Sequence, residues 1–211
     1  MSMDLSLAPS TIVTILITLV ISLSVHEATH AYTSLKLGDA TAFEHGRVSF
    51  NPLRHIDPVA TILLPVITLI LFHVPFLAAK PVPFNPNRLK YDEFGAALVA
   101  AAGPLSNLAM AVLGALLTHL AGNNITILNI LSVFVSVNVA IFVFNLIPIP
   151  PLDGSRVLYA FAPEGLQRIM AQIEPFGFFV VFGLVLAVPG FSSLLFFMND
   201  AVLRLLPIVR V

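Results

Sequence analysis

Two histidines and a glutamate near the start of the chain have the spacing of a metal-binding catalytic motif. The segment reads His26-Glu27-Ala28-Thr29-His30. On a helix, side chains four residues apart project from the same face, so both imidazoles can bind one zinc ion. Glu27 can then contact a water held by that ion and act as a general base. The motif therefore predicts a zinc site that activates water.

The motif lies at the end of a long apolar stretch that begins near Thr11. No charged residue precedes Glu27 in this stretch, and a helix beginning at Thr11 would place Glu27 about 24 Å along its axis. A bilayer core is about 30 Å thick, so the carboxylate would lie at membrane depth, where an ionisable group needs a partner. The alternative is a pair of structural histidines that hydrogen-bond to neighbouring helices, with Glu27 paired or protonated.

The composition is that of a membrane protein. Of the 211 residues, 58% are hydrophobic and only 10% are charged, whereas soluble domains carry about 25% charged residues. We therefore expect an integral membrane protein whose surroundings are a lipid bilayer. The formal net charge of −1 gives no reason to expect a nucleic-acid partner. The chain has no cysteine, which excludes disulfides, thiolate zinc ligands and a cysteine nucleophile.

The apolar runs predict an all-α polytopic fold with about five to six membrane segments. After the first run come residues 59–79, 94–120, 125–147 and 176–197, and the tail from Asp200 can span or lie on the surface. We interpret the chain, 1–211, as one membrane-embedded domain. Its catalytic core would occupy about 10–160 and its C-terminal membrane segments about 165–211.

A small β element is expected near the active site. Residues 47–50 alternate like a short strand, and the two prolines within 79–84 favour an extended path. The edge of such a strand could hold an extended segment of a substrate.

Basic residues predict the topology. Lys36, Arg47 and Arg54 follow the first apolar run, so the N-terminus should lie outside and the histidine motif near the cytoplasmic face. Basic residues flank 59–79 on both sides. A re-entrant hairpin fits these charges better than a simple crossing, although 21 apolar residues are also enough to span.

A catalytic zinc ion usually has three protein ligands and one open position, so a third ligand is needed. The candidates are a carboxylate or one of the other histidines, which are His45, His55, His73 and His119. Asp153 is the best of these, because it returns to the side of His26 and His30 if 59–79 re-enters the membrane. Its position before Gly154 is equally typical of a helix N-cap, so both roles stay open.

Asparagines in the apolar runs are further candidates. Asn107 shares a helical face with small residues, among them Gly103 and Gly114. It is either an interhelical hydrogen-bonding residue or part of the site. Asn138 and Asn145 lie two turns apart on one side of the next run.

Three segments in this order resemble the site-2 protease family of intramembrane zinc metalloproteases, peptidase family M50. They are His26-Glu27-x-x-His30, Gly103-Pro104-Leu105-Ser106-Asn107 and Asn145-x-x-Pro148-x-Pro150-x-Leu152-Asp153-Gly154. The match extends through most of residues 20–165. Within the family, the chain resembles the compact subgroup that lacks a PDZ or CBS domain. The resemblance implies one zinc ion per chain, with His26, His30 and Asp153 as ligands and Glu27 as general base. It also implies that Asn145 and Asn107 orient the substrate or the developing oxyanion.

The function expected from this resemblance is hydrolysis of peptide bonds in or near the transmembrane helices of other membrane proteins, in a prokaryotic cell membrane. The alternative from another class is a zinc or proton transporter that uses the same ligands. Transporters often repeat their broken helices in two halves, and this sequence has neither a second His-Glu cluster nor such a repeat. A catalytically dead scaffold would need a lost ligand or base, and none is missing. The substrate's identity and the oligomeric state are not predicted.

Overall fold

The computed structural model describes residues 9–55 and 82–208, and these residues are helices joined by short turns. The helices, in chain order, are α1 (Pro9–Lys36), α2 (Thr41–Glu44), α4 (Asp92–Thr118), α5 (Ile125–Asn145), α6 (Asp153–Phe161), α7 (Glu164–Ile173), α8 (Gly177–Ala187) and α9 (Phe191–Leu205). Short 3-10 turns lie at Pro52–Arg54 (η1), Pro86–Arg88 (η3) and Glu174–Phe176 (η4). Four stretches are long and apolar enough to cross a membrane: α1, α4, α5 and residues 164–187. The protein is therefore an integral membrane protein.

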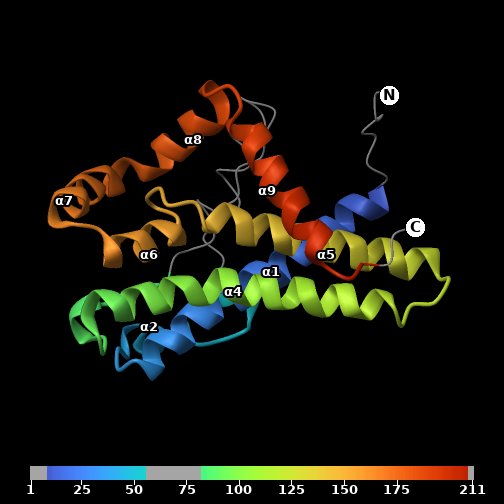
Figure 1. Cartoon of the computed structure of the whole chain (residues 1–211). Coiled ribbons are helices and arrows are strands. Elements are labelled where there is room, and N and C mark those ends of the chain that lie inside the picture. Colours follow the sequence, from blue (N-terminus) through green and yellow to red (C-terminus); the bar gives the residue numbers. More distant parts are fainter. Residues whose placement is uncertain (1–8, 56–81, 209–211) are drawn as a thin grey trace.

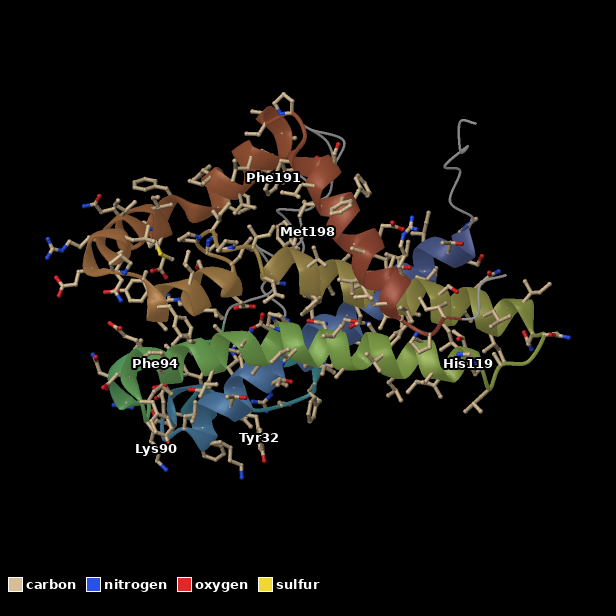
Figure 2. The ribbon with its side chains drawn as sticks, in the orientation of Figure 1. Tyr32, Lys90, Phe94, His119, Phe191 and Met198 are labelled. Atoms are coloured by element: carbon tan, nitrogen blue, oxygen red, sulfur yellow. The ribbon has the colours of Figure 1, made fainter. Side chains whose placement is uncertain are left out.

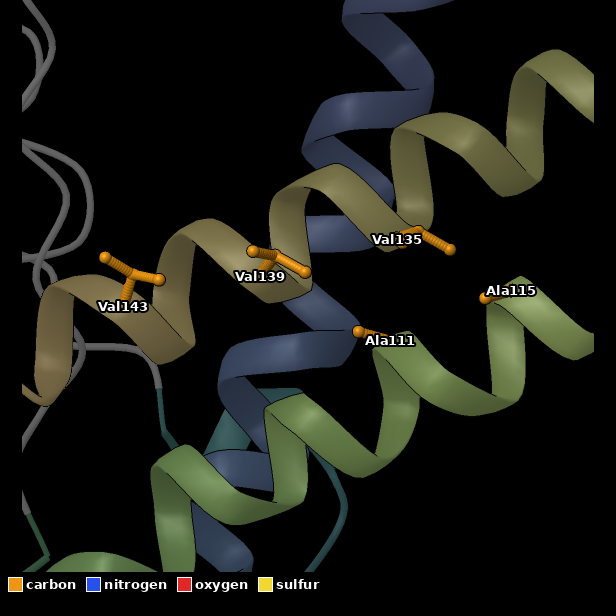
Figure 3. Packing of buried hydrophobic residues seen from close by; sticks show 5 residues of the cluster. All are labelled: Ala111, Ala115, Val135, Val139 and Val143. Carbon is orange, nitrogen blue, oxygen red and sulfur yellow. The ribbon is translucent and has the colours of Figure 1, made fainter. Parts of the chain in front are cut away.

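Helices α1, α4 and α5 pack against one another and form the centre of the molecule (Figure 1). Small residues of α4 allow α5 to approach closely. Ala111 and Ala115 of α4 contact the valines of α5 in a fully buried cluster (Figure 3), which consists of Ala111, Ala115, Val135, Val139 and Val143. A Cβ atom on Gly114 would lie 2.9 Å from the ring of Phe134, so this close approach depends on glycine there.

The C-terminal third of the chain returns across the bundle. Helices α6 and α7 lie at the end where α4 begins, and α8 and α9 then form an arch that comes down onto α5 (Figure 1). Gly190 forms the corner between α8 and α9 with a φ of +88°, a left-handed conformation that favours glycine. Tyr32, Lys90 and Phe94 mark one end of the bundle, and His119 marks the other (Figure 2).

Two parts of the predicted fold differ from the structure. Residues 47–50 form no strand, because the Arg47 guanidinium donates to the carbonyl of Arg54 and the Asn51 side chain accepts from Leu53 N, which folds this segment into turns. Residues 82–84 are extended but pair with no strand, and 79–81 lie outside the described residues. The predicted β element is thus not found in the part of the chain that the structure describes.

Four candidate membrane segments are found where five to six were predicted. The last of them covers 164–187 and not the predicted 176–197, because the chain turns at Gly190 between α8 and α9. The run 59–79 falls within 56–81, outside the described residues, so neither a span nor a re-entrant hairpin is assigned to it. Helix α9 has 15 residues, which is shorter than the roughly 20 that cross a bilayer alone.

One buried carboxylate joins the end of α1 to the segment that follows residue 82. Asp39 is fully buried and accepts hydrogen bonds from Thr41 N at 3.0 Å, Ser34 Oγ at 3.2 Å and Asn85 N at 2.6 Å. Burial raises the pKa of Asp39, but the hydrogen bonds from Thr41, Asn85 and Ser34 outweigh it and hold the pKa below its ordinary value. Phe84, next to Asn85, packs together with Leu37 against a buried cluster that includes Ala96 and Val99 of α4.

Replacing Asp39 with asparagine should destabilise the protein by about 1–3 kcal/mol at pH 7, because one of the buried N–H donors would lose its acceptor. The difference in the free energy of unfolding between wild type and Asp39→Asn should have its full size above the ordinary carboxyl pKa of about 3.9. It should be lost as the pH falls below that value and through the lowered pKa of the folded state. Denaturant titration in detergent at several pH values measures this. Asp200→Asn, which removes an exposed ion pair with Arg204, is the control and should change little. An equal effect of both substitutions would contradict the role given to Asp39.

Candidate metal centre

Helix α1 brings its two motif histidines together on a buried face. His26 and His30 are both buried, and their rings meet edge to face with centroids 4.6 Å apart. Their Nε2 atoms are 3.0 Å apart. The spacing of four residues predicted a shared face, and the structure shows that the same nitrogen of each ring points to one place.

Asp153 reaches these nitrogens from the first turn of α6. Its Oδ2 atom lies 3.1 Å from His26 Nε2 and 3.4 Å from His30 Nε2. Helix α6 begins at Asp153 itself, and no side chain caps it. The N-cap interpretation of Asp153 is therefore wrong. A Cβ atom on Gly154 would lie 2.2 Å from Leu146 O, so glycine there lets α6 begin directly against the end of α5.

The three atoms fit the dimensions of a zinc site. A tetrahedral zinc ion with bonds of about 2.0–2.1 Å separates its ligand atoms by about 3.3 Å. The three separations here are 3.0, 3.1 and 3.4 Å. Asp153 Oδ2 is buried and has no hydrogen-bond partner, as expected of an oxygen that faces a cation. Two imidazole nitrogens and one carboxylate oxygen are also a donor set that zinc accepts.

The outer nitrogen of each ring is held by a hydrogen bond. His30 Nδ1 lies 2.7 Å from the backbone oxygen of Val99, and His26 Nδ1 lies 2.6 Å from Asn107 Oδ1. Both partners are acceptors, so each Nδ1 carries the proton and each Nε2 keeps its lone pair. This arrangement orients an imidazole for metal binding and fixes its tautomer.

The charge of Asp153 also suits a metal ligand. Burial raises the pKa of this carboxyl, but its interactions with His26 and His30 more than offset burial and place the pKa below its ordinary value. Asp153 is thus ionised at neutral pH, which is the form that binds a cation.

Helix α4 contributes the space in which the imidazoles lie. A Cβ atom on Gly103 would come within 2.3 Å of His30 Nε2 and 2.7 Å of His26 Nε2. The sequence placed Gly103 in a small packing stripe and in the second segment of the family resemblance, but it indicated no role for this glycine in the site. Its position one turn before Asn107 was a signal that this stripe faces the site.

A cavity of about 950 Å³ adjoins the cluster. Glu27 and Asn145 line it beside His26, His30 and Asp153. Most of the remaining wall is apolar. It includes Leu19 and Leu23 from α1, Val99 from α4, Ile141 and Phe144 from α5, Val181 from α8, and Leu195 from α9. Water and a peptide can therefore meet beside the three candidate ligands.

Asn107 lies elsewhere than its expected role requires. It is fully buried and is not part of the cavity wall. Its oxygen faces His26 and its nitrogen donates to Asn138 Oδ1 at 3.0 Å. It thus contacts the candidate centre and not the space for a substrate.

The other histidines are not near the cluster. His45 and His55 bond to backbone oxygens of the turns around α2 and η1, and His119 bonds to Pro207 O at the far end of the bundle. His73 lies outside the described residues.

Comparison with known proteins identifies the family. The model of peptidase family M50 matches residues 117–188. A relative named "Putative zinc metalloprotease YwhC", from Bacillus subtilis (strain 168), is 36% identical over 204 residues, which cover 90% of each chain. The chain belongs to peptidase family M50. It is therefore a site-2 protease family member and a zinc metalloprotease.

Two further relatives of this M50 peptidase carry the name "Putative zinc metalloprotease Rip2". The protein from Mycolicibacterium smegmatis is 31% identical over 171 residues, which are 76% of this chain and 61% of the relative. The protein from Mycobacterium tuberculosis (strain ATCC 35801 / TMC 107 / Erdman) is 31% identical over 170 residues, 79% of this chain and 63% of the relative. No solved structure matches the chain.

Substituting alanine for Gly103 should lower the zinc content of the purified M50 peptidase well below that of the wild type. The added methyl group would occupy the space of the two Nε2 atoms, although alanine is otherwise favoured over glycine in a helix. Gly183→Ala is the control, because a Cβ atom there meets nothing within 4 Å. Elemental analysis of zinc per chain, together with circular dichroism to confirm folding, measures the difference. Full zinc occupancy in Gly103→Ala would contradict the placement of the imidazoles.

Proposed function

We propose that this zinc metalloprotease is an intramembrane endopeptidase whose metal ion is held by His26, His30 and Asp153. The observation that carries the proposal is the convergence of their three ligand atoms, 3.0–3.4 Å apart, on a cavity formed by apolar helices. Two of these helices, α1 and α5, are long enough to cross a membrane. A hydrolytic site built among such helices is suited to peptide bonds that lie in the bilayer.

Glu27 is proposed as the general base. A zinc ion held by these residues would lower the pKa of the attacking water and polarise the scissile carbonyl. Glu27 lines the same cavity next to His26. Its carboxylate accepts a proton from the attacking water and later passes it to the nitrogen of the leaving amine.

Asn145 is proposed to stabilise the oxyanion. It lies at the end of α5 in the cavity wall, and one hydrogen of its amide donates to Ile141 O at 3.0 Å. An amide nitrogen has two hydrogens, so one is left to donate to the oxygen on which charge develops. Asn107 is instead assigned to the orientation of His26, because it is fully buried and bonded to that ring.

The proposed substrate is a transmembrane helix of another protein, unwound around the bond that is cut. Backbone groups of an unwound segment need polar partners, because lipid offers none. In the cavity wall such partners include Asn145 of α5 and Ser192 and Asn199 of α9. The surrounding leucine, isoleucine and phenylalanine side chains would contact the apolar side chains of the substrate.

A metal transporter is not favoured. A transport path needs successive sites across the membrane. Among residues 9–55 and 82–208, one group of three metal-ligating side chains has converging atoms, and it consists of His26, His30 and Asp153.

Replacing Glu27 with glutamine should leave zinc binding intact and reduce cleavage at least about 100-fold, because an amide cannot accept the proton. The assay is cleavage of a reconstituted single-span membrane protein that the wild type cuts, with zinc content measured on the same preparation. Glu44→Gln, at an exposed position of α2, is the control and should cleave normally. Normal cleavage by Glu27→Gln would rule out this mechanism.

The proposed orientation puts the N-terminus outside and the metal centre toward the cytoplasm. It rests on the basic residues at the end of the bundle that holds α2 and η3, including Lys36, Arg54 and Lys90.

Single-cysteine labelling in intact cells should show this orientation, since the natural chain has no cysteine. A membrane-impermeant maleimide should label Asn123→Cys, in the exposed turn between α4 and α5, without cell disruption. Glu44→Cys should react only after the membrane is opened. The reverse pattern would show that the topology is inverted.

A further inference from the structure

We infer that Asn138 of α5 is a positioning residue for the metal centre, because it fixes through Asn107 which nitrogen of His26 carries the proton. The inference rests on the proposed function, in which His26 is a zinc ligand. The side chain of Asn138 hydrogen-bonds to Asn107 and to Phe134 O and not to the candidate ligand atoms. It also lies outside the three segments that carry the family resemblance.

Asn107 and Asn138 form a polar pair inside an apolar contact between α4 and α5. Both side chains are 0% exposed. Their neighbours along the helices are Ala111, Val135 and Val139, which belong to the buried apolar cluster. A buried amide without partners is strongly unfavourable, so each oxygen and nitrogen of this pair has to find a complementary group.

The direction of every hydrogen bond in this pair follows from one backbone carbonyl. Phe134 O can only accept, so the group of Asn138 that lies 2.9 Å from it is the nitrogen. Asn138 Oδ1 then faces Asn107, and it too can only accept, so Asn107 presents its nitrogen at 3.0 Å. Asn107 Oδ1 is thereby turned to His26 Nδ1 at 2.6 Å. That nitrogen must carry the hydrogen, which leaves the lone pair of His26 Nε2 free for a metal ion.

A flip of either amide would break the series. If Asn138 were reversed, its oxygen would face Phe134 O and its nitrogen would face Asn107 Nδ2. If Asn107 alone were reversed, its amide nitrogen would face His26 Nδ1. Because both groups would then be donors, His26 Nδ1 would have to give up its proton. The proton would move to Nε2, the atom that faces His30 and Asp153. The orientation of Asn138 therefore selects the metal-binding tautomer.

The two histidines depend on this pair to different degrees. His30 Nδ1 donates directly to Val99 O, a backbone group that no side-chain substitution removes. Asn107 Nδ2 also lies 3.5 Å from Ser22 O, a longer and weaker contact that holds part of its orientation without Asn138. We therefore expect loss of Asn138 to matter less than loss of Asn107, and to act on His26 alone.

The test is a double-mutant cycle on zinc affinity, measured by competition with a chromophoric chelator on the full chain in detergent. Asn107→Leu should weaken zinc binding by about 10–100-fold, the range for groups that orient a metal ligand. Asn138→Leu should weaken it by a smaller factor, up to about tenfold. The double variant should bind no more weakly than Asn107→Leu, because Asn138 acts only through Asn107.

Matched variants separate this role from a general effect on packing. Ser22→Ala removes a buried hydroxyl group that lies close to Asn107 and has no hydrogen-bond partner. This variant should bind zinc like the wild type. Asn138→Ala is the second variant if leucine prevents folding. Nitrogen-15 NMR of histidine-labelled, zinc-free protein should show the His26 ring protonated at Nδ1 in the wild type. In a variant that lacks Asn138, the same ring should appear as a mixture of tautomers.

The outcomes distinguish the two levels of the proposal. If His26→Ala binds zinc as tightly as the wild type, the proposed metal centre is wrong. If His26→Ala loses zinc while Asn138→Leu and Asn138→Ala bind it like the wild type, the centre stands and the role of Asn138 is overturned. Additive losses in the double variant would overturn that role too.

Discussion

Crowding of three lone-pair-bearing atoms is the constraint on which the rest of the structure depends. His26 Nε2, His30 Nε2 and Asp153 Oδ2 lie 3.0–3.4 Å from one another in a buried position. Such atoms repel unless a proton or a cation lies among them, and burial among apolar helices strengthens the repulsion. A zinc ion held by the three proposed ligands would remove this cost and turn the arrangement into a water-activating centre. The surrounding helices can be understood as the means of holding these atoms at that spacing.

Each neighbouring element meets one requirement of the centre. Helix α1 supplies two imidazoles from one face, and the proline-rich connection after α5 returns the chain so that Asp153 faces them. Helix α4 gives space at Gly103 and a backbone acceptor at Val99. Asn107, held by Asn138 of α5, orients the remaining imidazole. Packing between α4 and α5 is thereby tied to the tautomer of a candidate ligand.

The sequence indicated the residue types of the site better than their partners. The spacing of His26 and His30 follows from helix geometry, so their shared face was predictable. Whether Asp153 is a ligand or a helix cap was not predictable, because this depends on how α6 begins against α5. For Asn107 the sequence left two roles open, an interhelical hydrogen bond or a place in the site. The interhelical bond is found, to Asn138 of α5, and long-range packing turns the amide oxygen toward His26. The strand expected at 47–50 failed because side-chain bonds of Arg47 and Asn51 stabilise turns there, and alternation alone does not reveal such bonds.

The most direct measurement is the position of zinc in crystals of the protein, located by anomalous diffraction at the zinc absorption edge. The account predicts a single peak about 2 Å from His26 Nε2, His30 Nε2 and a carboxylate oxygen of Asp153. A zinc peak that is bound by other residues, or that lies beyond bonding distance of any of these three, would contradict it.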